Sequence, residues 1–134
     1  MKNMPFSSSK TQEGSAMLEG MMGLLLFSIG VLGIMGMQAV SIKSSVEAKY
    51  RTDASFLANQ VIGQMWTDRN SLASYVSVPN VANPKTAAWQ SEVANALPAS
   101  VGQIAVAGDQ VTVTVSWNAA GQLLHQFTSV ARIN

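Results

Sequence analysis

Residues 14–42 read GSAMLEGMMGLLLFSIGVLGIMGMQAVSI, and no charged residue follows Glu19 within this stretch. About 20 helical residues, each adding about 1.5 Å, cross the roughly 30 Å hydrocarbon core of a bilayer. The length and composition of the stretch therefore predict a membrane-spanning helix. A charge in or beside such a span is costly and is interpreted first as functional, so Glu19 is a candidate functional residue.

The composition of the chain excludes several classes of function. The 134 residues amount to one ordinary domain, and the net charge of +1 gives no electrostatic reason to expect nucleic acid as a partner. The absence of cysteine excludes disulfide frameworks, thiolate nucleophiles and cysteine metal sites. Residues 43–134 remain beyond the span, which is enough for a small hydrophobic core.

Residues 1–14 are polar, lack apolar periodicity and are expected to be disordered. A cleaved secretory signal peptide is one interpretation, because Ala39, Val40 and Ser41 resemble a small-residue cleavage site. However, the apolar run exceeds a signal peptide's usual 7–15 residues, and a glutamate precedes it instead of a basic region. A plain, uncleaved anchor is the other simple alternative.

Gly14, the following residues Ser15 to Glu19 and the long apolar run together resemble the class III signal of type IV prepilins. Residues 14–66, including 28–38 and 54–65, are similar to the PilV-type minor pilins. The resemblance implies that a prepilin peptidase cuts between Gly14 and Ser15, that the new amine of Ser15 is methylated, and that Glu19 is the fifth residue of the mature chain. Two residues depart from the family pattern: Ser15 replaces the preferred Phe or Met, and Glu13 occupies a position that is often basic.

The resemblance also implies a function and a location. The expected protein is a minor pilin that is incorporated into a type IV pilus, or primes its assembly, for functions such as cell motility. It would cross the bacterial inner membrane once, with its C-terminal part in the periplasm, and enter the pilus on assembly. Its implied partners are other minor pilins, the major pilin, the prepilin peptidase, the pilus assembly platform and membrane lipid. A minor pseudopilin of a type II secretion system and a membrane-anchored periplasmic binding domain remain as alternatives.

The physical chemistry of Glu19 is consistent with an assembly role. After cleavage, Ser15 would carry an α-amine with a pKa of about 7.7–8.0, roughly one helical turn from the Glu19 carboxylate. Such a pair offsets the cost of moving two charges into an apolar environment, and the amine of a neighbouring subunit could serve equally. Gly30, Gly33 and Gly36 would allow close helix packing or a bend, although glycine is also common in membrane helices generally.

The residues beyond the span predict an amphipathic helix over residues 43–69, a loop over 75–84 and a short helix over 86–97. The apolar stripe of the first helix comprises Val46, Tyr50, Ala54, Leu57, Ala58, Val61, Ile62, Met65 and Trp66. The shared apolar face of the second comprises Trp89, Val93, Ala96 and Leu97.

A period of two then indicates strands. Val111, Val113, Val115 and Trp117 alternate with polar residues, residues 102–106 are the expected hairpin partner, and 123–133 form a third strand of open register. The predicted fold class is α+β and pilin-like, with a long N-terminal helix packed on a small C-terminal antiparallel sheet. The helix is transmembrane in its first half and amphipathic in its second. The expected organisation is a leader at 1–14, a transmembrane or filament-core helix at 15–42 and a periplasmic pilin domain at 43–134.

The sequence contains no recognisable active site, so we expect no enzyme, no catalytic residue, no cofactor and no metal site. His125 is the single histidine and is interpreted as structural or solvated. Four acidic residues beyond the span show no metal-ligand or acid–base spacing: Asp53, Asp68, Glu92 and Asp109. Trp66, Trp89 and Trp117 are interpreted as core residues.

Overall fold

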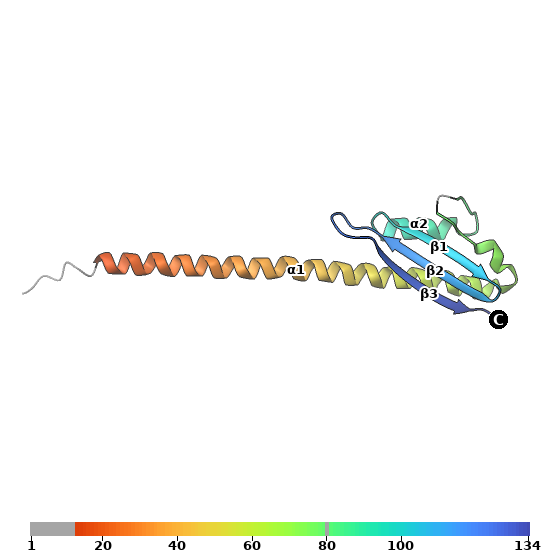
Figure 1. The fold of residues 1–134 in the computed structure, drawn as a ribbon, viewed down its shortest axis with the longest axis horizontal. Helices are drawn as coiled ribbons and strands as arrows, with labels where there is room; N and C mark the ends of the chain where they lie inside the picture. The colour runs from red at the N-terminus through yellow and green to blue at the C-terminus, as the bar shows by residue number, and fades with distance from the viewer. Residues whose placement is uncertain (1–12, 80) are drawn as a thin grey trace, which may run out of the picture. The chain divides into compact units, whose positions relative to one another are not determined.

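The computed structural model describes residues 13–79 and 81–134. It has an α+β, pilin-like layout in which a long N-terminal helix packs against a three-stranded antiparallel sheet (Figure 1). The chain divides into two compact units, Met1–Ser44 and Ser45–Asn134. The disorder expected for residues 1–14 falls largely outside the described residues, but at residues 13 and 14 that prediction was wrong, because the first helix already begins at Glu13.

Helix α1 spans Glu13–Thr67, 55 residues without interruption, and confirms the prediction of one very long helix. Globular helices average about 10–14 residues, so this length needs more than the packing of one small domain to explain it. The helix ends at Thr67, two residues before its predicted end at Arg69. Its last turn tightens as the Asp68 N–H donates to the Met65 carbonyl at 3.2 Å, an i to i−3 bond of the 3₁₀ type.

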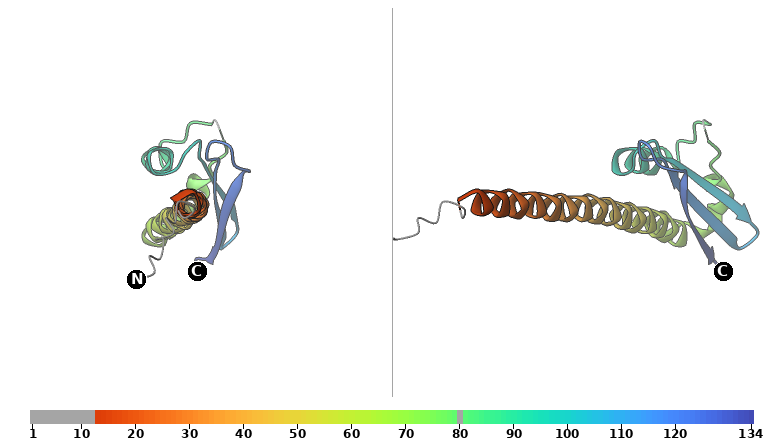
Figure 2. Two further views of the ribbon diagram at one scale, coloured as in Figure 1. Left: turned by 90° about the vertical axis from the view of Figure 1, so that its left-hand side faces the viewer. Right: turned by 60° about the vertical axis from the view of Figure 1, so that its left-hand side comes forward.

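The hydrophobic core lies entirely in the second unit, between the sheet and its two helices. Viewed end-on, α2 and the unit's part of α1 lie on the same side of the sheet (Figure 2). From α1 the core takes Ala54, Leu57, Ala58, Val61, Ile62 and Met65, as predicted. The predicted stripe was wrong at its ends, because Val46 is 39% and Trp66 45% exposed. Trp66 follows buried Met65, and a step of one residue turns the side chain about 100° around the helix axis.

A 3₁₀ helix, η1 (Arg69–Tyr75), follows α1 and buries Leu72 and Tyr75. The sequence did not predict this element. The segment after it pairs briefly with the sheet, since Ser77 and Ile104 exchange backbone hydrogen bonds of 3.0 and 3.1 Å. The predicted loop therefore begins after Tyr75 and partly covers the edge of the first strand.

Helix α2 (Ala87–Ala96) confirms the predicted short helix, with Thr86 and Leu97 as its flanking caps. Trp89 is 2% exposed, and its indole N–H donates to the Leu57 carbonyl of α1 at 2.9 Å. This bond and the burial of Val93 and Leu97 fix α2 against the core.

The strands β1 (Val101–Ala107), β2 (Gln110–Trp117) and β3 (His125–Arg132) form an antiparallel meander in the order β1-β2-β3. A two-residue turn joins the first pair, with Gly108 at φ 63°, a conformation that glycine adopts without a Cβ clash. In β2 the predicted alternation of buried and less buried side chains is confirmed. The register of β3 directs its odd-numbered residues, such as Phe127 and Ala131, toward the core. The third strand starts two residues later than predicted, which leaves Leu123 and Leu124 in the turn.

Candidate functional site

The first part of α1 presents an apolar surface on every side. Among residues 14–46 all side chains are exposed except that of Val31, which is half-buried. Met17 at 75% and Phe27 at 72% exposure are representative. By length and composition α1 can cross a membrane, and it is the one helix in the described part of the chain that can. The segment is therefore compatible with a single-pass membrane anchor.

The residues singled out near the start of the chain all lie at the beginning of this helix. Gly14 and Ser15 belong to its first turn, whose N–H groups have no carbonyl partner within the helix. Ser15 and Glu19 are four residues apart and so lie on one face of the helix. Glu19 is exposed and is the one charged residue in the sequence of residues 14–42. If the chain were cleaved before Ser15, the new amine would lie about one helical turn from this carboxylate.

Gly30, Gly33 and Gly36 lie within the uninterrupted part of α1. Beyond its chain neighbours and the backbone of its own helical turns, a Cβ built on any of the three would meet no atom of the described chain within 4 Å. Packing within this subunit therefore does not require glycine at these positions, and their role in helix packing or bending stays a prediction about contacts with other helices. Nearby Ser28 donates its hydroxyl to the Leu24 carbonyl at 2.7 Å, which satisfies a polar group inside the apolar run.

A polar cluster joins η1 to the loop before α2. The Asp68 carboxylate forms an ion pair with Lys85 and accepts hydrogen bonds from the hydroxyls of Ser71 and Tyr75. The Lys85 hydrogen bond lowers the pKa of Asp68 and raises that of Lys85. Burial raises the pKa of the Tyr75 phenol. The cluster was not predicted, since Asp68 and Lys85 are 17 positions apart in the sequence. Its contacts connect the start of η1 to the loop before α2.

The remaining titratable candidates also have structural partners. The His125 ring stacks on Trp117, with centroids 5.7 Å apart and planes at 17°. Asp53 pairs with Lys49 at 3.1 Å, Glu92 accepts a hydrogen bond from Gln60 at 2.8 Å, and Asp109 pairs with Arg132 at 3.2 Å. Within residues 13–79 and 81–134, no three His, Cys, Asp or Glu side chains are placed to hold a metal ion. Trp89 and Trp117 are buried as predicted.

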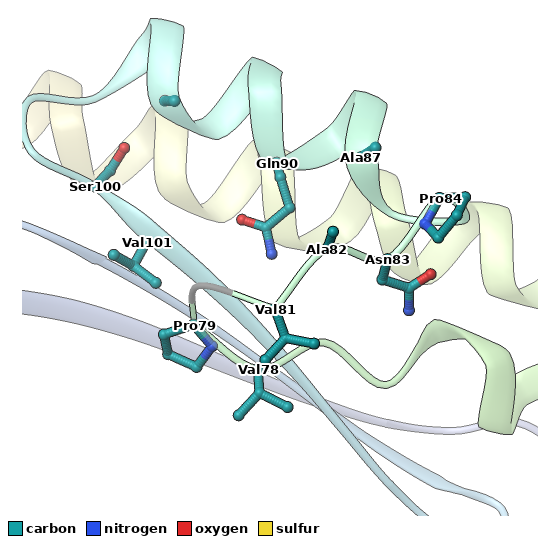
Figure 3. Close-up of a pocket in the computed structure, with 11 residues that line it drawn as sticks. Val78, Pro79, Val81, Ala82, Asn83, Pro84, Ala87, Gln90, Ser100 and Val101 are labelled. Carbon is teal, nitrogen blue, oxygen red and sulfur yellow. The ribbon is translucent and has the colours of Figure 1, made fainter.

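A pocket of about 620 Å³ lies between α2, the start of β1 and the preceding loop (Figure 3). Val78, Val81 and Val101 form much of its lining. Its three polar side chains donate to the protein itself. The Asn83 amide donates to the carbonyls of residues 74 and 76. The Gln90 amide donates to the Ser77 hydroxyl and to the Gly102 carbonyl. The Ser100 hydroxyl donates to the carbonyls of residues 93 and 97. These bonds stabilise the loop and leave the pocket mainly apolar.

Comparisons with protein-family models, with curated proteins and with solved structures find no match to this chain. The resemblance to type IV prepilins therefore stays a prediction based on the residues themselves.

Proposed function

We propose that this chain is a minor pilin, a subunit that joins a type IV pilus or primes its assembly. The observation that carries the proposal is the difference between the two parts of α1. One uninterrupted helix presents apolar side chains on all sides in its first part and supplies one face of a folded core in its last part. A helix of this kind suits a subunit that is first anchored in the membrane. On assembly, the same segment would pack among the helices of a filament.

The proposed maturation is cleavage between Gly14 and Ser15 by a prepilin peptidase, followed by methylation of the Ser15 amine. The position of Gly14 in the first turn of α1 supports this step. A peptidase needs locally extended backbone, and unwinding a first turn breaks few hydrogen bonds because its N–H groups lack intrahelical partners. Intact-mass and N-terminal peptide measurements on membrane-extracted protein should give a chain that starts at Ser15. A mature chain starting at Met1 or Ile42 would contradict the proposal.

The proposed role of Glu19 is to pair with an N-terminal amine. In the membrane the amine of the same subunit can serve, because it would lie about one helical turn away. On assembly the helix leaves lipid for a helical bundle, where a carboxylate without a cation is poorly solvated. The amine of a neighbouring subunit would then both neutralise Glu19 and set the axial position of the two helices.

The location and partners follow from this role. The subunit would be anchored in the bacterial inner membrane with its sheet domain in the periplasm, and would enter the pilus on assembly. It would contact membrane lipid, the prepilin peptidase, the assembly platform, other minor pilins and the major pilin. Its function would be structural and not enzymatic.

Complementation of a deletion strain tests the proposal, with surface pili, membrane abundance and cleavage state scored side by side. Glu19→Ala should be processed and inserted normally but should reduce piliation. Glu19→Gln, which keeps the shape of the side chain, should fail in the same way, whereas Glu19→Asp should recover part of the function. Normal piliation by Glu19→Ala at normal abundance would refute the pairing role. Loss of protein export with unchanged pili would instead assign the chain to a secretion pseudopilus.

A further inference from the structure

The turn between β2 and β3 carries two adjacent leucines that point away from the core. Leu123 is 85% and Leu124 67% exposed, and Leu123 has the highest exposed fraction among the large exposed apolar side chains of the described chain. The turn before them is fixed by backbone hydrogen bonds of 3.0 Å, from the Asn118 N–H to the Pro98 carbonyl and from the Gln122 N–H to that of Ala119. An ordered turn therefore holds the two leucines exposed and away from the core.

The turn lies at the end of the second unit where its part of α1 begins (Figure 1). At the opposite end the Arg69 side chain donates to the carbonyl of the last residue, Asn134, at 3.4 Å, so the end of β3 lies beside the end of α1. From there β3 runs back over eight residues, about 26 Å at roughly 3.3 Å per residue. At 1.5 Å per residue, this length corresponds to about 17 residues of helix. The turn therefore reaches approximately the level of residues 45–52.

Residues 45–52 are also the part of the unit nearest the anchor along the chain. The uncharged run ends at Ile42, three residues before the unit begins at Ser45. If α1 crosses a bilayer, the chain leaves the lipid within a few residues of Ser45, the first residue of this unit.

We propose that Leu123 and Leu124 form a second membrane contact, resting in the headgroup region of the leaflet from which the anchor emerges. The size of the patch favours lipid over protein as the occupant. A specific protein interface buries about 800 Å² on each partner, far more than two side chains provide, whereas binding to a lipid interface grows with each increment of apolar area that it buries. The contact rests on the membrane anchor of the proposed function but not on pilus assembly. It would limit rotation of the sheet domain about the anchor before assembly.

The absence of cysteine allows a direct test, because a single introduced cysteine can carry an environment-sensitive fluorophore. The full chain would be reconstituted at low density into vesicles of phosphatidylethanolamine and phosphatidylglycerol, with and without lipid spin-labelled at the headgroup. The probe at Leu123→Cys should shift to the blue and lose most of its emission to the spin label. The matched control is Ala107→Cys, exposed at the sheet's other turn, where neither change is expected.

A third probe, Leu25→Cys, reports on the anchor with lipid spin-labelled in the acyl chain. Quenching at residue 25 without quenching at 123 would overturn the second contact and leave the anchor intact. No quenching at either residue would overturn both. Equal quenching at 107 and 123 would show that the sheet domain has no preferred face toward the membrane and would also overturn the proposal. Excimer emission between pyrene labels at residue 123 would assign the leucines to a second copy of the chain instead.

Discussion

Gly102 packs closely against the indole ring of Trp89, and replacing it should destabilise the sheet domain. A Cβ built at Gly102 would lie 2.5 Å from Cη2 and 2.6 Å from Cζ3 of that ring. Carbon atoms in contact are normally about 3.5–4.0 Å apart, so Gly102→Ala must move the ring by about 1 Å. The ring is 2% exposed, and its N–H is held by the Leu57 carbonyl, so it has little room to move.

The expected cost of Gly102→Ala combines two effects. Forcing an extra carbon into a packed core typically costs about 1–3 kcal/mol. Weakening the hydrogen bond from Trp89 to Leu57 adds about 0.5–1.5 kcal/mol. We therefore expect a loss of about 1.5–4.5 kcal/mol in the free energy of unfolding. With a urea m-value of about 2 kcal/mol per molar, the midpoint should fall by about 1–2 M.

The assay is urea denaturation of a chain truncated to residues 43–134, followed by tryptophan fluorescence and circular dichroism. Gly63→Ala is the matched control, because a Cβ at Gly63 meets no atom within 4 Å beyond its own helical turns, and the residue is exposed in a helix. It should be neutral or stabilising by up to about 1 kcal/mol.

A double-mutant cycle with Trp89→Phe isolates the clash, because phenylalanine lacks the two ring atoms that Gly102→Ala meets. The cost of Gly102→Ala should shrink in the Trp89→Phe background. Equal costs in both backgrounds, or unchanged midpoints in Gly102→Ala, would refute the steric explanation.

Two further predictions concern the core and the polar cluster. Leu57→Ala should lower the free energy of unfolding by about 2–5 kcal/mol, because Leu57 is 5% exposed. Phe56→Ala is the control: the neighbouring Phe56 side chain is 68% exposed, so the urea midpoint should change little. Similar midpoints for both variants would place the buried face of α1 elsewhere. The pKa of Asp68 is lowered by Lys85, so its contribution to stability is present above the unfolded-state pKa of about 3.9 and is lost as the pH falls below it. Asp68→Asn should therefore be less stable than wild type at neutral pH, and the difference should shrink in acid titrations monitored by circular dichroism; a difference independent of pH would contradict this assignment.

The sequence predicted most of the fold because its periodicities are strong and local. The α1 stripe at Leu57, Val61 and Met65 and the alternation through Val113 and Val115 each record one buried face. The predictions failed where packing against a neighbouring layer determines which side chains are buried. Trp66 is as apolar as its neighbours, but it lies outside the face that the sheet covers.

The third strand shows a second limit. Both alternating sets of β3 contain apolar residues, since Phe127 faces inward while Val130 is 56% exposed, so only pairing with β2 determines the register. A signal for the Leu123–Leu124 turn was present but missed: two adjacent large apolar residues in a strand cannot both face one core. Of the candidate site, Gly14, Ser15 and Glu19 were identified by resemblance, whereas the Asp68 cluster depends on tertiary contacts.

The contact between Gly102 and Trp89 also implies a rule for evolutionary divergence. A side chain larger than hydrogen can enter position 102 only if the ring at position 89 shrinks or shifts, so substitutions at the two sites should occur together. Distant relatives of this chain would then be recognisable by a linked pair: a glycine in the first strand and a tryptophan 13 residues earlier on the preceding helix. Such a pair should persist longer than unlinked positions as sequences diverge, because a change at either residue disturbs the packing of the other.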